Sequence, residues 1–191
     1  MQTPNPEKRN QIKAAAARLF AEVPFHEVTL ERVATTAKVG KGTLYVYFAS
    51  KEQLYEAVVA EGLAELVGRV EGRLQQTGAD ACQGLSAIVD ELLGFADRYP
   101  HMFTLMRSGH PIGNDTELAA ARSNLAATIE RVLRAGVASG ALDDPHPELT
   151  AHFVPAMVRS ARLYGPADAP RAEVGRHIVQ VLLRGLRPHS S

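Results

Sequence analysis

The sequence predicts an all-helical fold. Almost every segment of the 191 residues repeats its apolar side chains with a period near 3.6, and no convincing run alternates apolar with polar residues. Hydrophobic residues make up 46% of the chain, which is enough for a buried core in one domain or two small ones. We therefore expect about nine helices and no strands.

Three short helices are expected in the first part of the chain. The first covers about residues 7–23 and ends before a proline, which cannot continue a helix. The second begins after Thr29, whose hydroxyl is a good N-cap, and the third covers about residues 41–48. Leu44 and Phe48 lie four residues apart and supply the one apolar edge of the third helix. Its other side chains are mostly polar or aromatic, which indicates a helix displayed to a partner.

A long fourth helix follows at once. Ser50 is its expected N-cap, with an acidic residue and Gln53 in the first turn. Its apolar stripe continues to Leu74, well beyond the short helices, so we interpret it as a mechanical connection between two parts of the protein. Gly78 and Gly84 are expected to bracket the loop after it.

Five further helices complete the expected fold. The fifth stops near Tyr99, a short sixth covers about residues 101–108, and a long seventh ends at Gly140. The last two cover about residues 148–164 and 171–186. We find no internal repeat and no low-complexity tract.

The charges are distributed unevenly, although the formal net charge is zero. Residues 1–51 carry eight Lys and Arg against four Asp and Glu, and all five lysines of the chain lie in this segment. A basic end on a neutral chain is typical of a polyanion-binding module joined to something else.

Two short helices joined by a turn indicate that this polyanion is double-stranded DNA. A helix of about two turns is unstable alone, so a helix-turn-helix holds it against a support helix and leaves its outer face free for the major groove. The side chains of Lys41, Thr43, Tyr45 and Tyr47 can all donate hydrogen bonds to bases or phosphates. The flanking residues placed to hold the DNA backbone are Thr29 and Lys51.

Residues 41–52 resemble the signature of the TetR family of bacterial transcriptional regulators, with Lys41-Gly42-Thr43-Leu44-Tyr45-Val46-Tyr47-Phe48 followed by Ser50-Lys51-Glu52. The resemblance covers about residues 8–56. It implies a homodimer in which residues 1–50 form a helix-turn-helix DNA-binding head and residues 51–191 form a ligand-binding and dimerising body. By this resemblance, the DNA contacts fall on Thr29, Lys41, Gly42, Tyr45, Tyr47 and Lys51.

The turn before the third helix departs from the family pattern. Lys38 stands where the family often has glycine, at a position that favours positive φ, so we expect a strain of about 1 kcal/mol. The alternative is that Gly40 takes the bend. Val46 is apolar where some relatives have a polar or aromatic residue, so the base preference does not follow from the resemblance.

The candidate DNA contacts also have ordinary structural explanations. Tyr45 and Tyr47 are two residues apart on a helix and cannot share a face, so one could be exposed while the other packs in the core. Lys41 and Lys51 could be solvated surface charges, which is the usual state of a lysine.

The expected ligand of the body is a small, largely apolar molecule. Arg122 is the sharpest candidate, because a guanidinium within an apolar stripe needs a carboxylate or a ligand anion as its partner. The alternative is that the Arg122 side chain extends along its aliphatic part, so that the guanidinium reaches water and needs no partner in the protein. Aromatic residues and methionines could enclose a cavity or simply form packed core. The candidate set is Phe95, Tyr99, Met102, Phe103, Met106, Arg122, Phe153 and Met157, with Arg107 and His110 as lesser candidates.

The last two expected helices carry apolar faces with small residues, which allow helices of two subunits to approach closely. The family resemblance places a four-helix dimer interface there. Two heads must then reach major-groove faces about 34–36 Å apart on a palindromic operator, so dimer geometry is the quantity that a ligand can change. The candidate interface residues are Phe153, Ala156, Ser160, Val174, Ile178, Val181 and Leu182.

Enzyme, metal and membrane functions lack support in the sequence. The seven histidines show no metal-ligand spacing, and Cys82, alone in an expected loop, excludes a disulfide framework. Residues 40–43 superficially resemble a nucleotide-binding loop, but Thr35 stands where that motif needs its first glycine. We expect no cofactor.

We expect a cytoplasmic protein. No apolar run reaches the roughly 18–20 residues needed to span a bilayer, and residues 1–10 lack the apolar segment of a secretion signal. The sequence thus predicts a homodimeric repressor that leaves its operator when a ligand enters the body. The alternative is an architectural or protein-partnered DNA binder without a small-molecule ligand.

Overall fold

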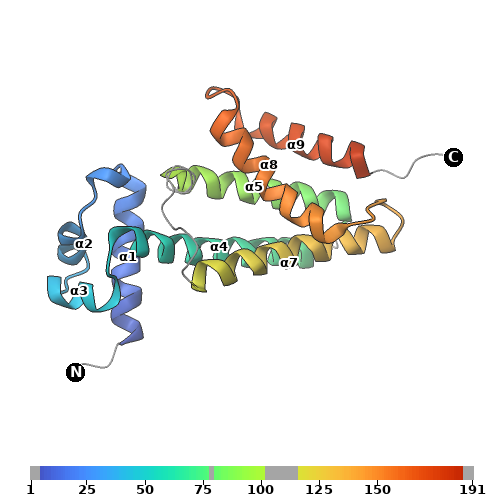
Figure 1. Cartoon of the computed structure of the whole chain (residues 1–191). Helices are drawn as coiled ribbons and strands as arrows, with labels where there is room; N and C mark the ends of the chain where they lie inside the picture. The colour runs from blue at the N-terminus through green and yellow to red at the C-terminus, as the bar shows by residue number, and fades with distance from the viewer. Residues whose placement is uncertain (1–4, 78–79, 102–115, 187–191) are drawn as a thin grey trace. The chain divides into compact units, whose positions relative to one another are not determined.

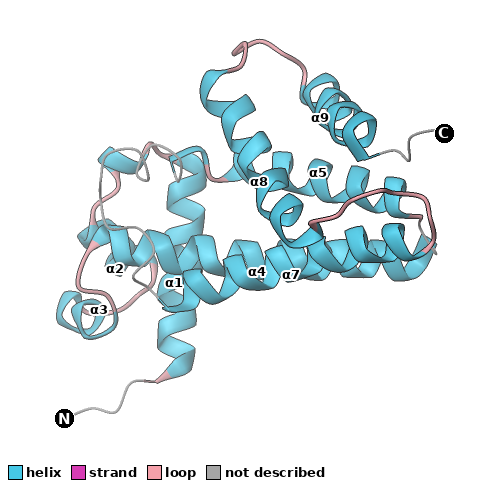
Figure 2. Ribbon diagram, turned by 45° about the vertical axis from the view of Figure 1, so that its right-hand side comes forward, coloured by secondary structure: helices cyan, strands magenta, loops and turns pink. Residues whose placement is uncertain are grey.

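The structure is a computed structural model that describes residues 5–77, 80–101 and 116–186 (Figure 1). Within these ranges it contains eight α-helices, one short 3-10 helix and no strand, so the predicted fold class is confirmed (Figure 2). The expected sixth helix, residues 101–108, lies almost entirely outside the described residues.

The chain divides into two compact units. The first contains residues 1–62 and 99–120, and the second contains residues 63–98 and 121–191. Two long helices, α4 (Lys51–Thr77) and α7 (Thr116–Ala138), contribute residues to both units. The functional division expected between residues 50 and 51 stays a prediction.

The first unit is built around three short helices and the start of α4. Asn5 caps the first helix, because its side chain accepts the Glu7 N–H at 2.8 Å. The buried apolar residues of this unit come from each of its α-helices, and Ile12, Val33 and Leu44 have no exposed surface. Its helices before α4 are α1 (Pro6–Glu22), the 3-10 helix η1 (Phe25–Glu27), α2 (Leu30–Thr36) and α3 (Lys41–Tyr47).

The turn between α2 and α3 bends at Lys38. Its φ is +53°, whereas Gly40 has a φ of −66°, so the expected positive φ falls on the lysine and the alternative at Gly40 is wrong. The Lys38 N–H donates to the Thr35 carbonyl at 3.1 Å, and the Val39 N–H donates to the Ala34 carbonyl at 3.0 Å. These two bonds are those of a Schellman motif, which normally has glycine where Lys38 stands.

Replacing Lys38 with glycine is expected to stabilise the protein by about 0.5–1 kcal/mol. Glycine removes the steric cost of the left-handed backbone, and the greater freedom of the unfolded chain offsets part of that gain. Lys38→Ala is the matched control, because it removes the charge and keeps the Cβ. The measurement is the urea midpoint at constant m-value. Equal midpoints for the glycine and alanine variants would show that the turn carries no strain.

The second unit is organised around α5 (Ala81–Arg98), which packs against both α8 (Pro147–Tyr164) and α9 (Arg171–Leu186). Its buried face repeats with helical spacing and includes Leu85, Ile88, Val89, Leu92 and Leu93.

The expected loop between Gly78 and Gly84 is wrong in its second boundary. Gly84 and Cys82 lie inside α5, because the Asp80 side chain accepts the Gln83 N–H at 2.8 Å and starts the helix earlier. Gly84 instead allows α7 to approach, since a Cβ there would lie 2.8 Å from a methyl carbon of Val132.

Candidate nucleic-acid interface

Helix α3 presents one face to solvent and another to the core. Leu44 and the residue that caps its end, Phe48, have no exposed surface, which confirms the predicted apolar edge. On the opposite face, Gly42, Tyr45 and Val46 follow the helical spacing i, i+3, i+4 and are all exposed. Tyr45 is 46% exposed and Val46 61%, so α3 displays two large side chains with little to bury them.

The N-terminus of α1 supports α3 from the side. The Tyr47 hydroxyl accepts the Asn5 N–H at 2.8 Å, and Tyr47 is half-buried. The Arg9 guanidinium lies 5.2 Å from the centre of the Phe48 ring and pairs with Glu117 at 3.0 Å. These contacts fix one end of α3 against α1, and sequence reasoning missed them because they join residues far apart in the chain.

Lys51 is held in place rather than left as a loose surface charge. Its Nζ donates to the Phe25 carbonyl at 2.7 Å and lies 4.3 Å from the centre of the Phe25 ring. That ring stacks on Phe20 at 5.6 Å and meets the edge of Tyr55 at 5.2 Å. The aromatic cluster therefore fixes the ammonium at the start of α4.

The N-caps on both sides of α3 are formed as predicted. The Thr29 hydroxyl accepts the Arg32 N–H at 3.2 Å, which starts α2. Ser50 accepts the Gln53 N–H at 3.1 Å, and the Gln53 side chain accepts the Ala49 N–H at 2.7 Å. The two remaining candidates lie on α3. Gly42 has nothing within 4 Å of a Cβ built on it, and Thr43 is half-buried.

Lys41 has an acidic partner that sequence reasoning missed. Its Nζ pairs with Glu31 of α2 at 2.5 Å, and both side chains are more than half exposed. The hydrogen bond from Lys41 holds the pKa of the Glu31 carboxyl below its usual value. The hydrogen bond to Glu31 raises the pKa of the Lys41 ammonium in turn. The pair is therefore charged at neutral pH, and a DNA phosphate would have to compete with Glu31 for Lys41.

Replacing Glu31 with glutamine is expected to tighten DNA binding about two- to fivefold, because an exposed carboxylate that repels phosphates and occupies Lys41 is removed. The dependence of log K on log salt is expected to steepen by about one ion, as Lys41 is released for a phosphate. Fluorescence anisotropy on an operator duplex at several salt concentrations measures both. Glu27→Gln is the control, since Glu27 pairs only with His26 at 3.7 Å among the described residues. Unchanged or weaker binding by Glu31→Gln would show that Glu31 does not restrain Lys41.

The described candidate effector residues differ in burial. Phe95 and Tyr99 are buried, at 2% and 8% exposure, and they belong to different units. Arg122 and Met157 are half-buried, whereas Phe153 is 56% exposed. Five candidates lie outside the described residues: Met102, Phe103, Met106, Arg107 and His110.

The candidate dimer residues divide into two groups. Ile178 and Leu182 are buried within the subunit, because they lie on the side of α9 that packs against α5. Phe153 and Val181 are exposed at 56% and 47%. The other members are partly or fully exposed, namely Ala156, Ser160 and Val174.

Among the residues placed by the structure, no helix is both long and apolar enough to cross a bilayer. Over the same residues, no three His, Cys, Asp or Glu side chains are grouped so that they could hold a metal ion.

Comparisons with known proteins agree with this geometry. The chain is 34% identical over 94 residues to the transcriptional activator FasR of Mycolicibacterium smegmatis, a match that covers 49% of the chain and 42% of FasR. The chain therefore spans less than half the length of that relative.

Solved structures share the fold over nearly the whole chain. The regulator FadR of Bacillus subtilis, solved with stearoyl-CoA, has a TM-score of 0.72 at 17% identity and covers 92% of this chain and 98% of its own. A TetR/AcrR regulator of Thermobifida fusca has a TM-score of 0.72 at 23% identity, covering 95% of this chain and 100% of its own.

The family model described as bacterial regulatory proteins of the tetR family matches residues 12–58, which span most of α1, all of α2 and α3, and the start of α4. These are the elements that build the displayed face of α3. Proteins of this family are DNA-binding transcription regulators rather than enzymes. The match to the TetR family of bacterial regulatory proteins thus covers residues 12–58 of the chain.

Proposed function

We propose that this protein is a homodimeric, ligand-responsive transcriptional regulator that binds a palindromic operator and is released from it by a small, largely apolar molecule. The observation that supports this proposal best is the outer face of α3. Gly42, Tyr45 and Val46 are exposed there while Leu44 and Phe48 are fully buried. A two-turn helix so anchored fits the major groove of a DNA duplex.

The residues of this interface divide into three proposed roles. Val46 and Tyr45 face the base edges, where the apolar Val46 suits contact with a thymine methyl group. Gly42 lets the start of α3 approach the DNA closely. The phosphates are held by Lys41, Thr43, Tyr47, Lys51 and the N-terminus of α2 at Thr29.

The double variant Lys41→Ala/Tyr47→Ala tests the DNA-binding assignment. It removes two of the proposed phosphate contacts, so operator retention in a gel-shift assay is expected to be lost while the dimer stays intact. Arg18→Ala is the control, because Arg18 is an exposed arginine of α1, outside α2 and α3. Unchanged retention by the double variant would contradict the assignment.

The proposed effector carries a fatty acyl chain as its apolar part, and the candidate to test is a fatty acyl thioester of coenzyme A, whose coenzyme A part is polar and anionic. FadR, which shares this fold, was solved with stearoyl-CoA, and Phe95 and Met157 give the body adaptable apolar surface. A ligand releases DNA only if it binds the two conformations unequally. Titration of stearoyl-CoA into the operator complex tests this, and a complex that resists saturating acyl-CoA of every chain length would favour the regulator without a small-molecule ligand.

We propose that the protein represses transcription. Because the relative FasR is named an activator, whether this protein represses or activates needs its own test. A reporter gene behind the operator, with and without the regulator, measures the sign of regulation.

The proposed dimer uses the exposed parts of α8 and α9, with Phe153 and Val181 at their centre. Sedimentation velocity should give twice the mass of one chain.

A further inference from the structure

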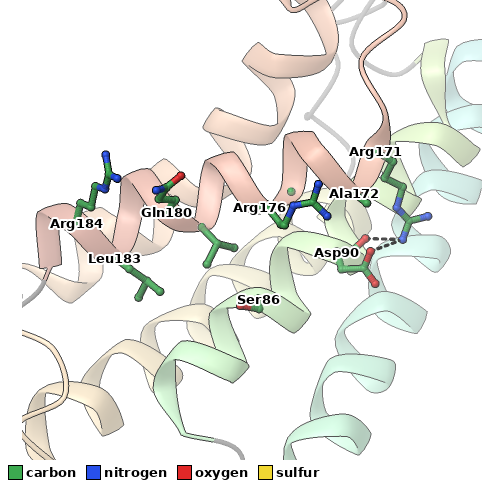
Figure 3. A pocket seen from close by; sticks show the side chains of 10 residues that line it. Ser86, Asp90, Arg171, Ala172, Arg176, Gln180, Leu183 and Arg184 are labelled. Carbon is green, nitrogen blue, oxygen red and sulfur yellow. Dashed lines mark hydrogen bonds and ion pairs between the residues drawn. The ribbon is translucent and has the colours of Figure 1, made fainter.

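A groove with cationic side chains lies between α5 and α9 in the second unit (Figure 3). Its volume is about 710 Å³, which is within the usual range of pockets for small molecules. None of the candidate effector or dimer residues lines it. The lining residues are Ser86, Asp90, Arg171, Ala172, Gly175, Arg176, Val179, Gln180, Leu183 and Arg184.

Two small residues on α9 help to leave space for the groove. α9 packs on α5 through the buried Ile178 and Leu182. Beside that contact, Ala172 and Gly175 leave space unfilled. A Cβ at Gly175 would lie 3.2 Å from the Leu93 side chain, so this glycine lets the two helices come together at the edge of the groove.

One end of the groove holds a fixed arginine. The Arg171 Nη2 donates to the Asp90 carboxylate at 2.7 Å and to the Asp90 carbonyl at 3.0 Å. The guanidinium also lies beside Gly94, 3.1 Å from where a Cβ would be. Asp90 has a second cation, Arg73, at 3.5 Å. Its negative charge is therefore shared between two arginines, and the groove keeps an excess of positive charge.

Arg176 adds a second guanidinium at the same end. Figure 3 shows Arg171 and Arg176 both directed toward Asp90, whereas Arg184 points away from it. The Arg176 guanidinium makes no hydrogen bond or ion pair with any residue that the structure describes. A guanidinium has five N–H donors and is always charged, so these two arginines can clamp an anion between them.

The other end of the groove has two apolar side chains, Val179 and Leu183, beside the polar Gln180 and Arg184. Val179 and Leu183 lie one and two turns beyond Arg176 on the same side of α9, a distance of about 5–10 Å along the axis. Val181 of the proposed dimer face is about 200° around the helix from Val179, so the groove and that face lie on opposite sides of α9.

We propose that the α5–α9 groove binds an organic anion whose phosphate or carboxylate group contacts Arg171 and Arg176 and whose short aliphatic segment lies on Val179 and Leu183. This site goes beyond the proposed function, because its occupation is measured without DNA and without the proposed effector.

Calorimetric titration of octyl phosphate into the full-length protein tests the proposal. We expect one molecule to bind per chain, with an affinity lowered at least tenfold in Arg176→Ala and in Leu183→Asp. Arg98→Ala is the matched control, since Arg98 is an exposed arginine at the C-terminal end of α5 and does not line the groove. Both groove variants change exposed or half-buried positions, and circular dichroism confirms that they fold.

Two further probes define the ligand. Octanoate in place of octyl phosphate distinguishes a carboxylate site from a phosphate site, and inorganic phosphate reports the contribution of the anion alone. The proposal is overturned if neither amphipathic probe binds, if Arg176→Ala binds as the unmodified protein does, or if inorganic phosphate binds as tightly as octyl phosphate. Loss of operator binding in any variant would concern the proposed function and not this site.

Discussion

Replacing Phe48 with alanine is expected to cost about 3–5 kcal/mol of unfolding free energy, because a fully buried aromatic side chain is removed and a cavity is left behind. Phe48 caps α3, and its N–H donates to the Leu44 carbonyl at 3.0 Å. Its ring also carries the Arg9 guanidinium at 5.2 Å. The variant should therefore lose the packing that holds α3 in place and, as a result, should no longer bind the operator.

Val46→Ala is the control for this prediction. Val46 is on the same helix but 61% exposed, so its truncation is expected to change stability by less than about 0.5 kcal/mol. Thermal and urea unfolding give both free energies. A gel shift compares Phe48→Ala with the unmodified protein, because Val46 itself belongs to the proposed DNA interface and is a control for stability alone. If Phe48→Ala proved as stable as Val46→Ala, the packing described for α3 would be wrong.

Local features of the first unit were predictable from sequence. The Thr29 and Ser50 caps and the apolar pair in α3 each depend on residues within four positions of one another. Helical period, capping chemistry and backbone sterics act over that range, so the sequence alone specifies them. The positive φ at Lys38 was expected from the family resemblance.

The contacts that tune the interface were not predictable in the same way. Glu31 and Lys41 meet because α2 and α3 cross at one particular angle, and Lys51 meets Phe25 across 26 residues of chain. Likewise, apolar spacing marked Ile178 and Leu182 as an interface without saying whether the partner was a second subunit or α5. A periodic pattern identifies a face, and only the tertiary structure identifies what covers it.

A glycine of the second unit shows the same limit of sequence reasoning, because what packs against it is set by the tertiary structure. Gly136 lies inside α7, where alanine would normally be favoured by up to about 1 kcal/mol. A Cβ at this position would lie 2.6 Å from the Ala81 Cβ and 2.6 Å from the Leu142 Cδ1. The Ala81 Cβ is fixed to its own backbone, so the start of α5 would have to move.

Gly136→Ala is therefore expected to destabilise the protein by about 1–3 kcal/mol, because the cost of overpacking exceeds the gain in helix propensity. Gly68→Ala in α4 is the matched control: nothing lies within 4 Å of its added Cβ, so it should stabilise by up to about 1 kcal/mol. The sign of the two changes in urea midpoint decides between packing and propensity. If both variants were stabilised, α5 and α7 could not be in close contact at Gly136, whereas opposite signs require that contact.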